Sequence, residues 1–190
     1  GKWFAVMHWN LEPDIMILAK AIASGMPLSA IVARKEIMEA WEATAHLFTA
    51  EGNPLSCAAA IATIDTMREE KLPERAARMG EYVMKRFREM MDKHEIIGDV
   101  RGKGLLIGVD LVKDKKTKEP ARDETLKVDW RCWEKGLILI HFGKSVLRIA
   151  PPLTITREEV DKALGIIEES IDDVERGRVP DEVVQRMGGW

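Results

Sequence analysis

The sequence contains few cysteines, no large excess of positive or negative charge, and no long hydrophobic run. Its two cysteines, Cys57 and Cys132, form no Cys-x-x-Cys pair, which excludes a secreted disulfide framework and favours a reducing cytoplasm. No stretch of about 18 residues is apolar and free of charge, and the first residues lack the order of a signal peptide, so we expect neither a membrane span nor an export signal, unless that signal lies upstream of Gly1. The formal net charge is -3, which makes nucleic acid an unexpected partner.

The side chains that hold metals and those that degrade on heating are also scarce. The histidines His8, His46, His94 and His141 have no partner at metal-ligand spacing, so no metal site is predicted. Asparagine occurs only at Asn10 and Asn53 and glutamine only at Gln185, and 32% of the residues are charged, a combination typical of heat-adapted proteins. The 190 residues, 46% of them hydrophobic, are sufficient for a globular chain with a real core.

Residues 1–72 have the pattern of a domain end. Apolar runs over residues 14–19 and 28–33 predict two strands, which we expect to be buried on both faces within a parallel sheet. Asn53-Pro54 predicts a helix start, and this helix continues to about Glu70. Two strands cannot complete a parallel sheet, so we expect the rest of this domain to lie upstream of Gly1 or on another chain.

Residues 73–177 have the pattern of a self-contained α/β domain. We expect helices over 73–95 and 123–135, strands over 96–101, 105–112, 137–141 and 146–150, a turn at 102–104, and a final helix that begins at the capping box of Thr156 and Glu159 and continues past Val174. Residues 178–190 form a tail with no assigned role.

Lys20 is the first candidate for chemistry. It follows the apolar strand expected over 14–19 and precedes the small residues Ala21, Ala23, Ser24 and Gly25. Ligands in open α/β sheets gather at the carboxyl ends of strands. A partly desolvated amine at such a place, beside residues too small to block a flat ring, could form an imine with an aldehyde. A surface lysine at the start of a helix is the alternative.

Thr49 is the second candidate, because it lies just ahead of the helix that Asn53 begins. A hydroxyl, the free backbone N–H groups of a helix N-terminus and the positive end of the helix dipole together suit a phosphate. A local turn hydrogen bond of the threonine is the alternative. Lys20 and Thr49 together would suit the aldehyde and phosphate ends of one cofactor.

Arg148 is the third candidate. It lies within the apolar strand expected over 146–150, just before Pro151-Pro152. A guanidinium buried on such a strand needs a carboxylate, since an unpaired buried charge is costly. The sequence leaves open whether that carboxylate belongs to the protein, in a structural ion pair, or to a substrate.

These motifs occur together in one known family. Residues 13–20 (PDIMILAK) and 25–30 (GMPLSA) resemble the cofactor-lysine segment of the class III aminotransferases, which use pyridoxal 5'-phosphate (PLP). Residues 49–60 are similar to that family's TxxGNPLxCAAA segment. Residues 100–105 (VRGKGL) and 147–153 (LRIAPPL) resemble parts of its carboxyl-terminal domain. The ordered matches span residues 1 to about 177.

The resemblance implies an α/β fold of the type I PLP-dependent transferase class, with the end of the large domain in residues 1–72 and the small C-terminal domain in 73–177. It also implies that Lys20 is catalytic and bonds PLP, that Thr49 binds the phosphate of the PLP in the neighbouring subunit of a homodimer, and that Arg148 meets a substrate carboxylate. The family's glycine-rich phosphate-binding segment and its Asp for the pyridine nitrogen have no counterpart here, so the intact enzyme is expected to be longer.

The function implied is that of an aminotransferase, which moves an amino group from an amino acid or an omega-amine, of the 4-aminobutyrate or ornithine type, to a 2-oxo acid such as 2-oxoglutarate. Two alternatives stay open. A racemase of the same fold would return the proton to the opposite face of the same carbon. A noncatalytic fragment would fold or dimerise without PLP.

Overall fold

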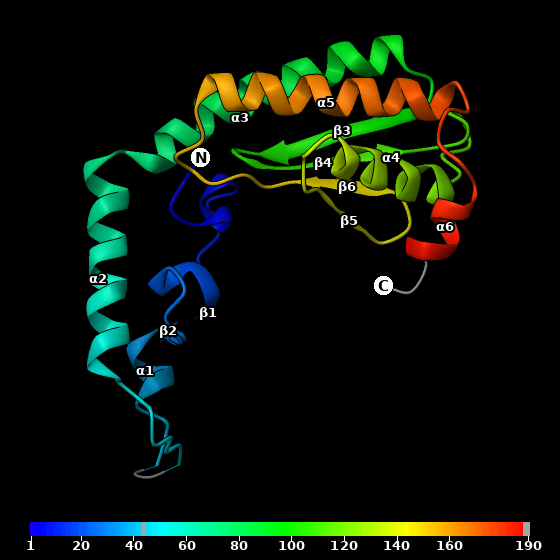
Figure 1. Cartoon of the computed structure of the whole chain (residues 1–190). Helices are drawn as coiled ribbons and strands as arrows, with labels where there is room; N and C mark the ends of the chain where they lie inside the picture. Colours follow the sequence, from blue (N-terminus) through cyan, green and yellow to red (C-terminus); the bar gives the residue numbers. More distant parts are fainter. Residues whose placement is uncertain (43–44, 188–190) are drawn as a thin grey trace. The chain divides into compact units, whose positions relative to one another are not determined.

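The computed structural model describes residues 1–42 and 45–187, which form two compact units (Figure 1). One unit comprises Lys2–Leu72, and the other comprises Gly1 and Pro73–Trp190. Each unit contains one antiparallel sheet. Within the described residues, no helix combines the length and the apolar composition needed to cross a lipid bilayer.

The first unit consists of short elements followed by one long helix. In chain order these are η1 (Ala5–His8), β1 (Ile15–Leu18), η2 (Lys20–Ala23), β2 (Ala30–Ala33), α1 (Lys35–Met38) and α2 (Pro54–Glu69). The two strands lie within the predicted ranges. They pair with each other, from Ile15 opposite Ala33 to Leu18 opposite Ala30.

The prediction of a parallel arrangement for these strands is wrong, whereas their burial was expected from segments outside this chain. The pair is antiparallel, and Ile15, Ile17 and Ile31 are at least half exposed, at 53%, 74% and 50%. The connection over residues 19–29 is shorter than the dozen or more residues that a parallel crossover requires. An apolar run indicates a strand but contains no information on the direction of its neighbour or on what covers its faces.

The start of α2 agrees with the prediction. Pro54 occupies the first turn, and the Asn53 Oδ1 atom accepts hydrogen bonds from the backbone N–H groups of Leu55 at 3.0 Å and Ser56 at 3.3 Å. These bonds satisfy two donors that a helix start otherwise leaves unpaired.

The second unit is a four-stranded sheet with helices on one face. Its elements are α3 (Leu72–Lys93), β3 (Ile97–Lys103), β4 (Leu106–Leu111), α4 (Arg122–Glu134), β5 (Ile140–Phe142), β6 (Val146–Ile149), α5 (Arg157–Glu175) and α6 (Glu182–Met187). The strand order is β3-β4-β6-β5, and every neighbouring pair is antiparallel. This mixed α/β architecture agrees with the predicted fold class.

Alternation along the strands separates a buried face from an open one. Helices α3 and α5 lie side by side over the buried face (Figure 1), where Val109 and Leu147 pack with 0% exposure. Phe87 on α3 and Ile171 on α5 are also fully buried in this core. Burying each such side chain stabilises the fold by roughly 1.5–3 kcal/mol.

Two predicted boundaries in this sheet are displaced. Gly102 lies inside β3 rather than in a turn. The position requires glycine because a Cβ there would lie only 2.6 Å from the carbonyl oxygen of Leu106. The turn falls instead at Gly104, whose φ of +55° favours glycine. β5 begins at Ile140, three residues later than predicted, because its register is determined by pairing with β6.

The last helices close the core. Thr156 and Glu159 form the predicted capping box, and the five apolar residues predicted to line one face of α5 are all buried: Val160, Leu164, Ile167, Ile171 and Val174. Beyond α5, Val179 and Val183 are 4% and 5% exposed and belong to the same core. Residues 178–187, part of the segment expected to be a tail without a role, therefore contribute to the packing of this unit.

Candidate functional site

Lys20 lies at a sharp exit from β1. It is the first residue of η2 and has a left-handed backbone with φ of +55°, which costs a residue with a Cβ roughly 1–2 kcal/mol. Strain of this kind is often found at functional positions. The side chain is exposed and lines an open cavity of about 580 Å³ together with Ala21, Ser24, Gly25, Met26, Pro27 and Leu28.

The segment after Lys20 is anchored to α2. Ala23 is 1% exposed, and the Ser24 and Thr63 hydroxyl oxygens lie 3.1 Å apart, within hydrogen-bonding distance. Among the described residues, none forms a hydrogen bond or an ion pair with the Lys20 amine. The Lys20 side chain therefore extends from an anchored turn and lines a cavity together with the small residues Ala21, Ser24 and Gly25 and the larger Met26, Pro27 and Leu28.

Thr49 lies in the turn over residues 49–52 that leads into α2, and its side chain is exposed. The expectation of free N–H groups at this helix start is corrected at two positions, because Asn53 already accepts from Leu55 and Ser56. Thr49 and Lys20 belong to the same unit, and no hydrogen bond joins them within the described ranges. A phosphate at Thr49 would therefore depend on the threonine hydroxyl and the turn more than on the helix.

Arg148 lies on the open face of the second sheet, opposite Ile140 of β5 and Gly108 of β4. The expected burial is wrong, because the side chain is exposed. Its guanidinium carbon is 5.1 Å from the ring centroid of Phe142, a cation–π distance. No carboxylate among the described residues pairs with it, so a structural ion pair is not observed. Arg148 also borders an apolar cavity of about 660 Å³.

A histidine–carboxylate pair lies on the helix side of the sheet, across from the face that carries Arg148, and the sequence did not predict it. His141 Nδ1 is 2.5 Å from Asp129 Oδ2, and Asp129 is 5% exposed. Burial raises the pKa of the Asp129 carboxyl, while the hydrogen bond and the charge of His141 oppose that rise. The partners come from β5 and α4, and a separation of 12 residues across a helix and a strand leaves no local pattern.

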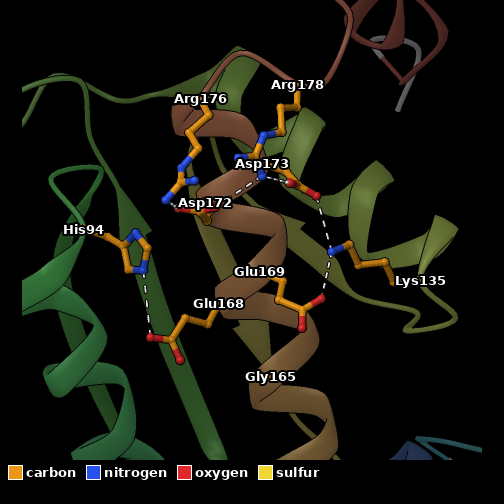
Figure 2. A pocket seen from close by; sticks show the side chains of 9 residues that line it. All are labelled: His94, Lys135, Gly165, Glu168, Glu169, Asp172, Asp173, Arg176 and Arg178. Atoms are coloured by element: carbon orange, nitrogen blue, oxygen red, sulfur yellow. Dashed lines mark hydrogen bonds and ion pairs between the residues drawn. The ribbon is translucent and has the colours of Figure 1, made fainter.

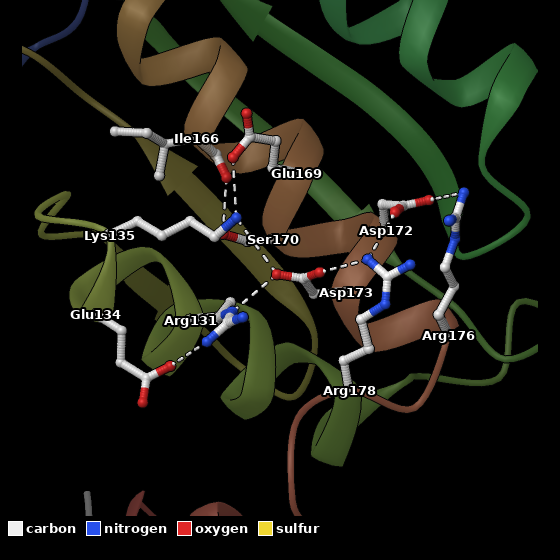
Figure 3. Close-up of polar contacts among 10 residues, drawn as sticks. All are labelled: Arg131, Glu134, Lys135, Ile166, Glu169, Ser170, Asp172, Asp173, Arg176 and Arg178. Atoms are coloured by element: carbon white, nitrogen blue, oxygen red, sulfur yellow. Dashed lines mark hydrogen bonds and ion pairs between the residues drawn. The ribbon is translucent and has the colours of Figure 1, made fainter.

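A pocket in the second unit is lined by charged side chains that pair with one another and stabilise the fold. Figure 2 shows its lining side chains, which come mainly from α5, with His94 and Lys135 on either side. Asp173 accepts hydrogen bonds from Arg131 Nε at 2.8 Å and Arg178 at 2.9 Å, and it lies 3.3 Å from Lys135 Nζ (Figure 3). The Arg131 contact, followed by that of Arg178, holds the pKa of Asp173 well below its ordinary value. These ion pairs join α4, α5 and the segment after α5.

The segment that contains Lys20 lies within the part of the chain that matches a family of cofactor-dependent enzymes. The family described as "Aminotransferase class-III" matches residues 1–171, and the chain belongs to this family. The aminotransferases of the family are PLP-dependent enzymes. An unpaired primary amine beside small residues suits bonding to the PLP aldehyde, so the residues present fit this cofactor.

Individual relatives differ in their reactions. The chain is 50% identical over its full length to the leucine/methionine racemase of Thermococcus litoralis, of which it covers 43%. It is 45% identical over 94% of its length to the isoleucine 2-epimerase of Lentilactobacillus buchneri, of which it covers 40%. The structure resembles a Bacillus anthracis aminotransferase with a TM-score of 0.83 and 38% identity, covering 88% of this chain and 40% of that one. The chain thus spans about two fifths of the proteins that it matches.

Proposed function

We propose that this chain is part of a PLP-dependent racemase that inverts the configuration at the α-carbon of a neutral amino acid. The observation that carries the proposal is a difference in similarity. Two racemases and an epimerase share 45–50% of their aligned residues with the chain, whereas aminotransferases of the same family share 36–40%. The relatives at the higher level act, by name, on leucine, methionine, isoleucine, alanine or serine.

Lys20 is the residue that we assign to proton transfer. When bound, PLP withdraws electron density from the substrate α-carbon and thereby acidifies its proton. The Lys20 amine, released when the substrate amine takes its place on the aldehyde, would remove that proton. An acid on the opposite face would supply the proton that inverts the configuration, and the Lys20 ammonium would lose its proton to solvent, so that no proton is gained or lost overall. The small residues around Lys20 leave the space that a ring and a moving amine require.

Arg148 and Thr49 are assigned to binding. The exposed guanidinium of Arg148, which has no acidic partner in the described chain, would hold the substrate carboxylate. The Thr49 hydroxyl would donate to the phosphate of the PLP held by the neighbouring subunit of a homodimer. The domain assignment of residues 1–72 to a large PLP-binding domain and of 73–177 to a small domain belongs to the same proposal.

Amino transfer to a 2-oxo acid such as 2-oxoglutarate is the second candidate. The family match and the 38% identity to an aminotransferase of known structure favour it. The two reactions share the first proton removal and differ in where the proton goes next. In amino transfer the proton that Lys20 removes would not return to the substrate α-carbon, and a 2-oxo acid would be required to complete the cycle.

One experiment separates the candidates. The full-length PLP-loaded enzyme is incubated with L-leucine, with and without 2-oxoglutarate, and the products are resolved by chiral chromatography. D-leucine formed without an acceptor supports the racemase, whereas an oxo acid formed only with 2-oxoglutarate replaces it by the aminotransferase. An enzyme that stays colourless after PLP addition would instead favour a noncatalytic role.

Lys20→Ala is expected to abolish turnover and the visible absorbance of PLP bonded to the protein, because the variant lacks the amine that we assign to the bond with the PLP aldehyde. Lys35→Ala is the matched control, since Lys35 is an exposed lysine of the same unit that pairs with Glu39 at 3.5 Å. Borohydride reduction followed by peptide mapping should attach the pyridoxyl group to the Lys20 peptide. Attachment elsewhere would refute the assignment.

A further inference from the structure

β5 contacts the rest of the second unit through two different faces. It is three residues long and lies at the edge of the sheet, so among the described residues backbone hydrogen bonds hold it on the β6 side alone. Successive side chains of a strand point to opposite faces. His141 is therefore directed toward the helices, while Ile140 and Phe142 are directed toward the open face on which Arg148 lies.

On the helix side, His141 is held by a buried carboxylate. Its Nδ1 atom lies 2.5 Å from Oδ2 of Asp129, and Asp129 belongs to a helix whose Val128 and Cys132 have 0% exposure. The other carboxylate oxygen of Asp129 is buried and has no hydrogen-bond partner among the described residues. If His141 moved away, a buried carboxylate would be left unpaired, which is costly, so the pair fixes the position of β5.

On the open side, the next residue of β5 holds the guanidinium. Phe142 places its ring centroid 5.1 Å from the guanidinium carbon of Arg148, within the range of a cation–π interaction. No acidic residue in the described part of the chain competes for this guanidinium. The aromatic ring therefore limits the orientations of Arg148 while leaving its N–H groups available to an incoming carboxylate.

We propose that Asp129, His141 and Phe142 are positioning residues that orient Arg148 for the carboxylate of the substrate. Asp129 fixes His141, the backbone of β5 fixes Phe142 relative to His141, and the Phe142 ring fixes the guanidinium. This inference rests on the proposed function only in the role of Arg148 as the carboxylate ligand. None of the three residues needs to touch the substrate.

The test measures binding of a carboxylate that cannot react with PLP. 4-Methylpentanoate has the carbon skeleton of leucine without its amine, and its Kd for the full-length PLP-loaded enzyme is measured by calorimetry. Arg148→Ala is expected to weaken binding about 10- to 100-fold, as for a lost charge-assisted hydrogen bond. Phe142→Leu is expected to weaken it about 2- to 5-fold, the value of an exposed cation–π contact.

Asp129 is tested by a disruptive and a conservative variant. Asp129→Ala should weaken binding about 2- to 5-fold, and combining it with Phe142→Leu should add nothing to Phe142→Leu alone, because both act through the same ring. Asp129→Asn, which keeps an acceptor for His141, should stay within about twofold of the wild type. Glu175→Gln is the control, since it alters the pair between Glu175 at the end of α5 and His94 just after α3, whose atoms lie 2.6 Å apart. It should leave the Kd unchanged.

The outcomes separate this inference from the proposed function. A folded Asp129→Ala enzyme that binds the probe as tightly as wild type, or effects of Asp129→Ala and Phe142→Leu that multiply, would overturn the positioning role. An Arg148→Ala enzyme with unchanged affinity would overturn it as well. Racemisation of L-leucine is measured in parallel. If it is absent while the Kd pattern holds, the reaction proposal fails and the positioning role stands.

Discussion

Replacement of Asp173 by asparagine should reduce the free energy of unfolding by about 2 kcal/mol. The side chain is 9% exposed and contacts three cations, with Arg131 Nε at 2.8 Å, Arg178 at 2.9 Å and Lys135 Nζ at 3.3 Å (Figure 3). Asparagine has nearly the same volume and keeps one acceptor oxygen. The variant therefore loses the charge and one charge-assisted hydrogen bond without creating a cavity. Such a bond is worth about 1.5–3 kcal/mol, and partial exposure of the cations favours the lower half of that range.

The loss should depend on pH in one direction. Hydrogen bonds from Arg131 and then Arg178 lower the pKa of Asp173 below its ordinary value of 3.8. A carboxyl whose pKa is lower in the folded state stabilises the fold fully above its unfolded pKa, and this stabilisation is lost as the pH falls. The difference between wild type and Asp173→Asn should therefore be constant near neutral pH and shrink below about pH 4, by at most about 1.4 kcal/mol per pH unit.

The assay is urea denaturation followed by circular dichroism at pH 7 and at several values below pH 5. The control is Asp172→Asn, since Asp172 is 33% exposed and pairs with Arg176 at 2.9 Å and, more distantly, with Arg178 at 3.5 Å. An ion pair of this kind contributes about 0.5 kcal/mol. Equal stability of Asp173→Asn and wild type at pH 7 would refute the reasoning. A stability difference that stays constant down to pH 3 would refute its electrostatic part.

Two further predictions concern packing. Gly80→Ala should destabilise the second unit by about 3 kcal/mol, because the new Cβ would lie 2.0 Å from the backbone oxygen of Gly104. Gly165→Ala on α5, where nothing lies within 4 Å, should be neutral or stabilising by up to about 1 kcal/mol, and similar unfolding curves for the two variants would contradict this account. Cys132 is fully buried and desolvation raises its pKa to about 11, so iodoacetamide at pH 8 should label it only in denaturant, as measured by mass spectrometry on a Cys57→Ser background. Native labelling of Cys132 would show that the core around α4 opens.

Elements marked by strong local signals were predicted close to their observed places. Asn53-Pro54 begins α2, and the capping box at Thr156 begins α5, because the hydrogen bonds that start a helix involve residues within one turn. Gly102 shows the limit of such reasoning. A glycine is favoured both by turns and by close backbone approach, and only the position of the Leu106 carbonyl oxygen distinguishes the two.

For the candidate site, the sequence indicated some residues and gave no signal for others. Lys20 stood out because its small neighbours and the preceding apolar strand are adjacent in the sequence, and the family match covers that segment. For Arg148, apolar neighbours led to an expectation of burial, but strand alternation places its side chain on the open face. The pairing of Asp129 with His141 had no sequence signal, since it depends on how α4 packs against β5.

The sequence by itself determined the features that depend on neighbouring residues: the helix starts, the position of the strands, the lysine segment and the family. Tertiary structure alone decided that β1 and β2 are antiparallel, that Phe142 rather than a carboxylate accompanies Arg148, and that three cations surround Asp173. The physical reason is the distance along the chain over which each interaction acts. Capping and alternation act within a few residues, whereas burial, ion pairing and desolvation depend on which distant segments the folded chain brings into contact.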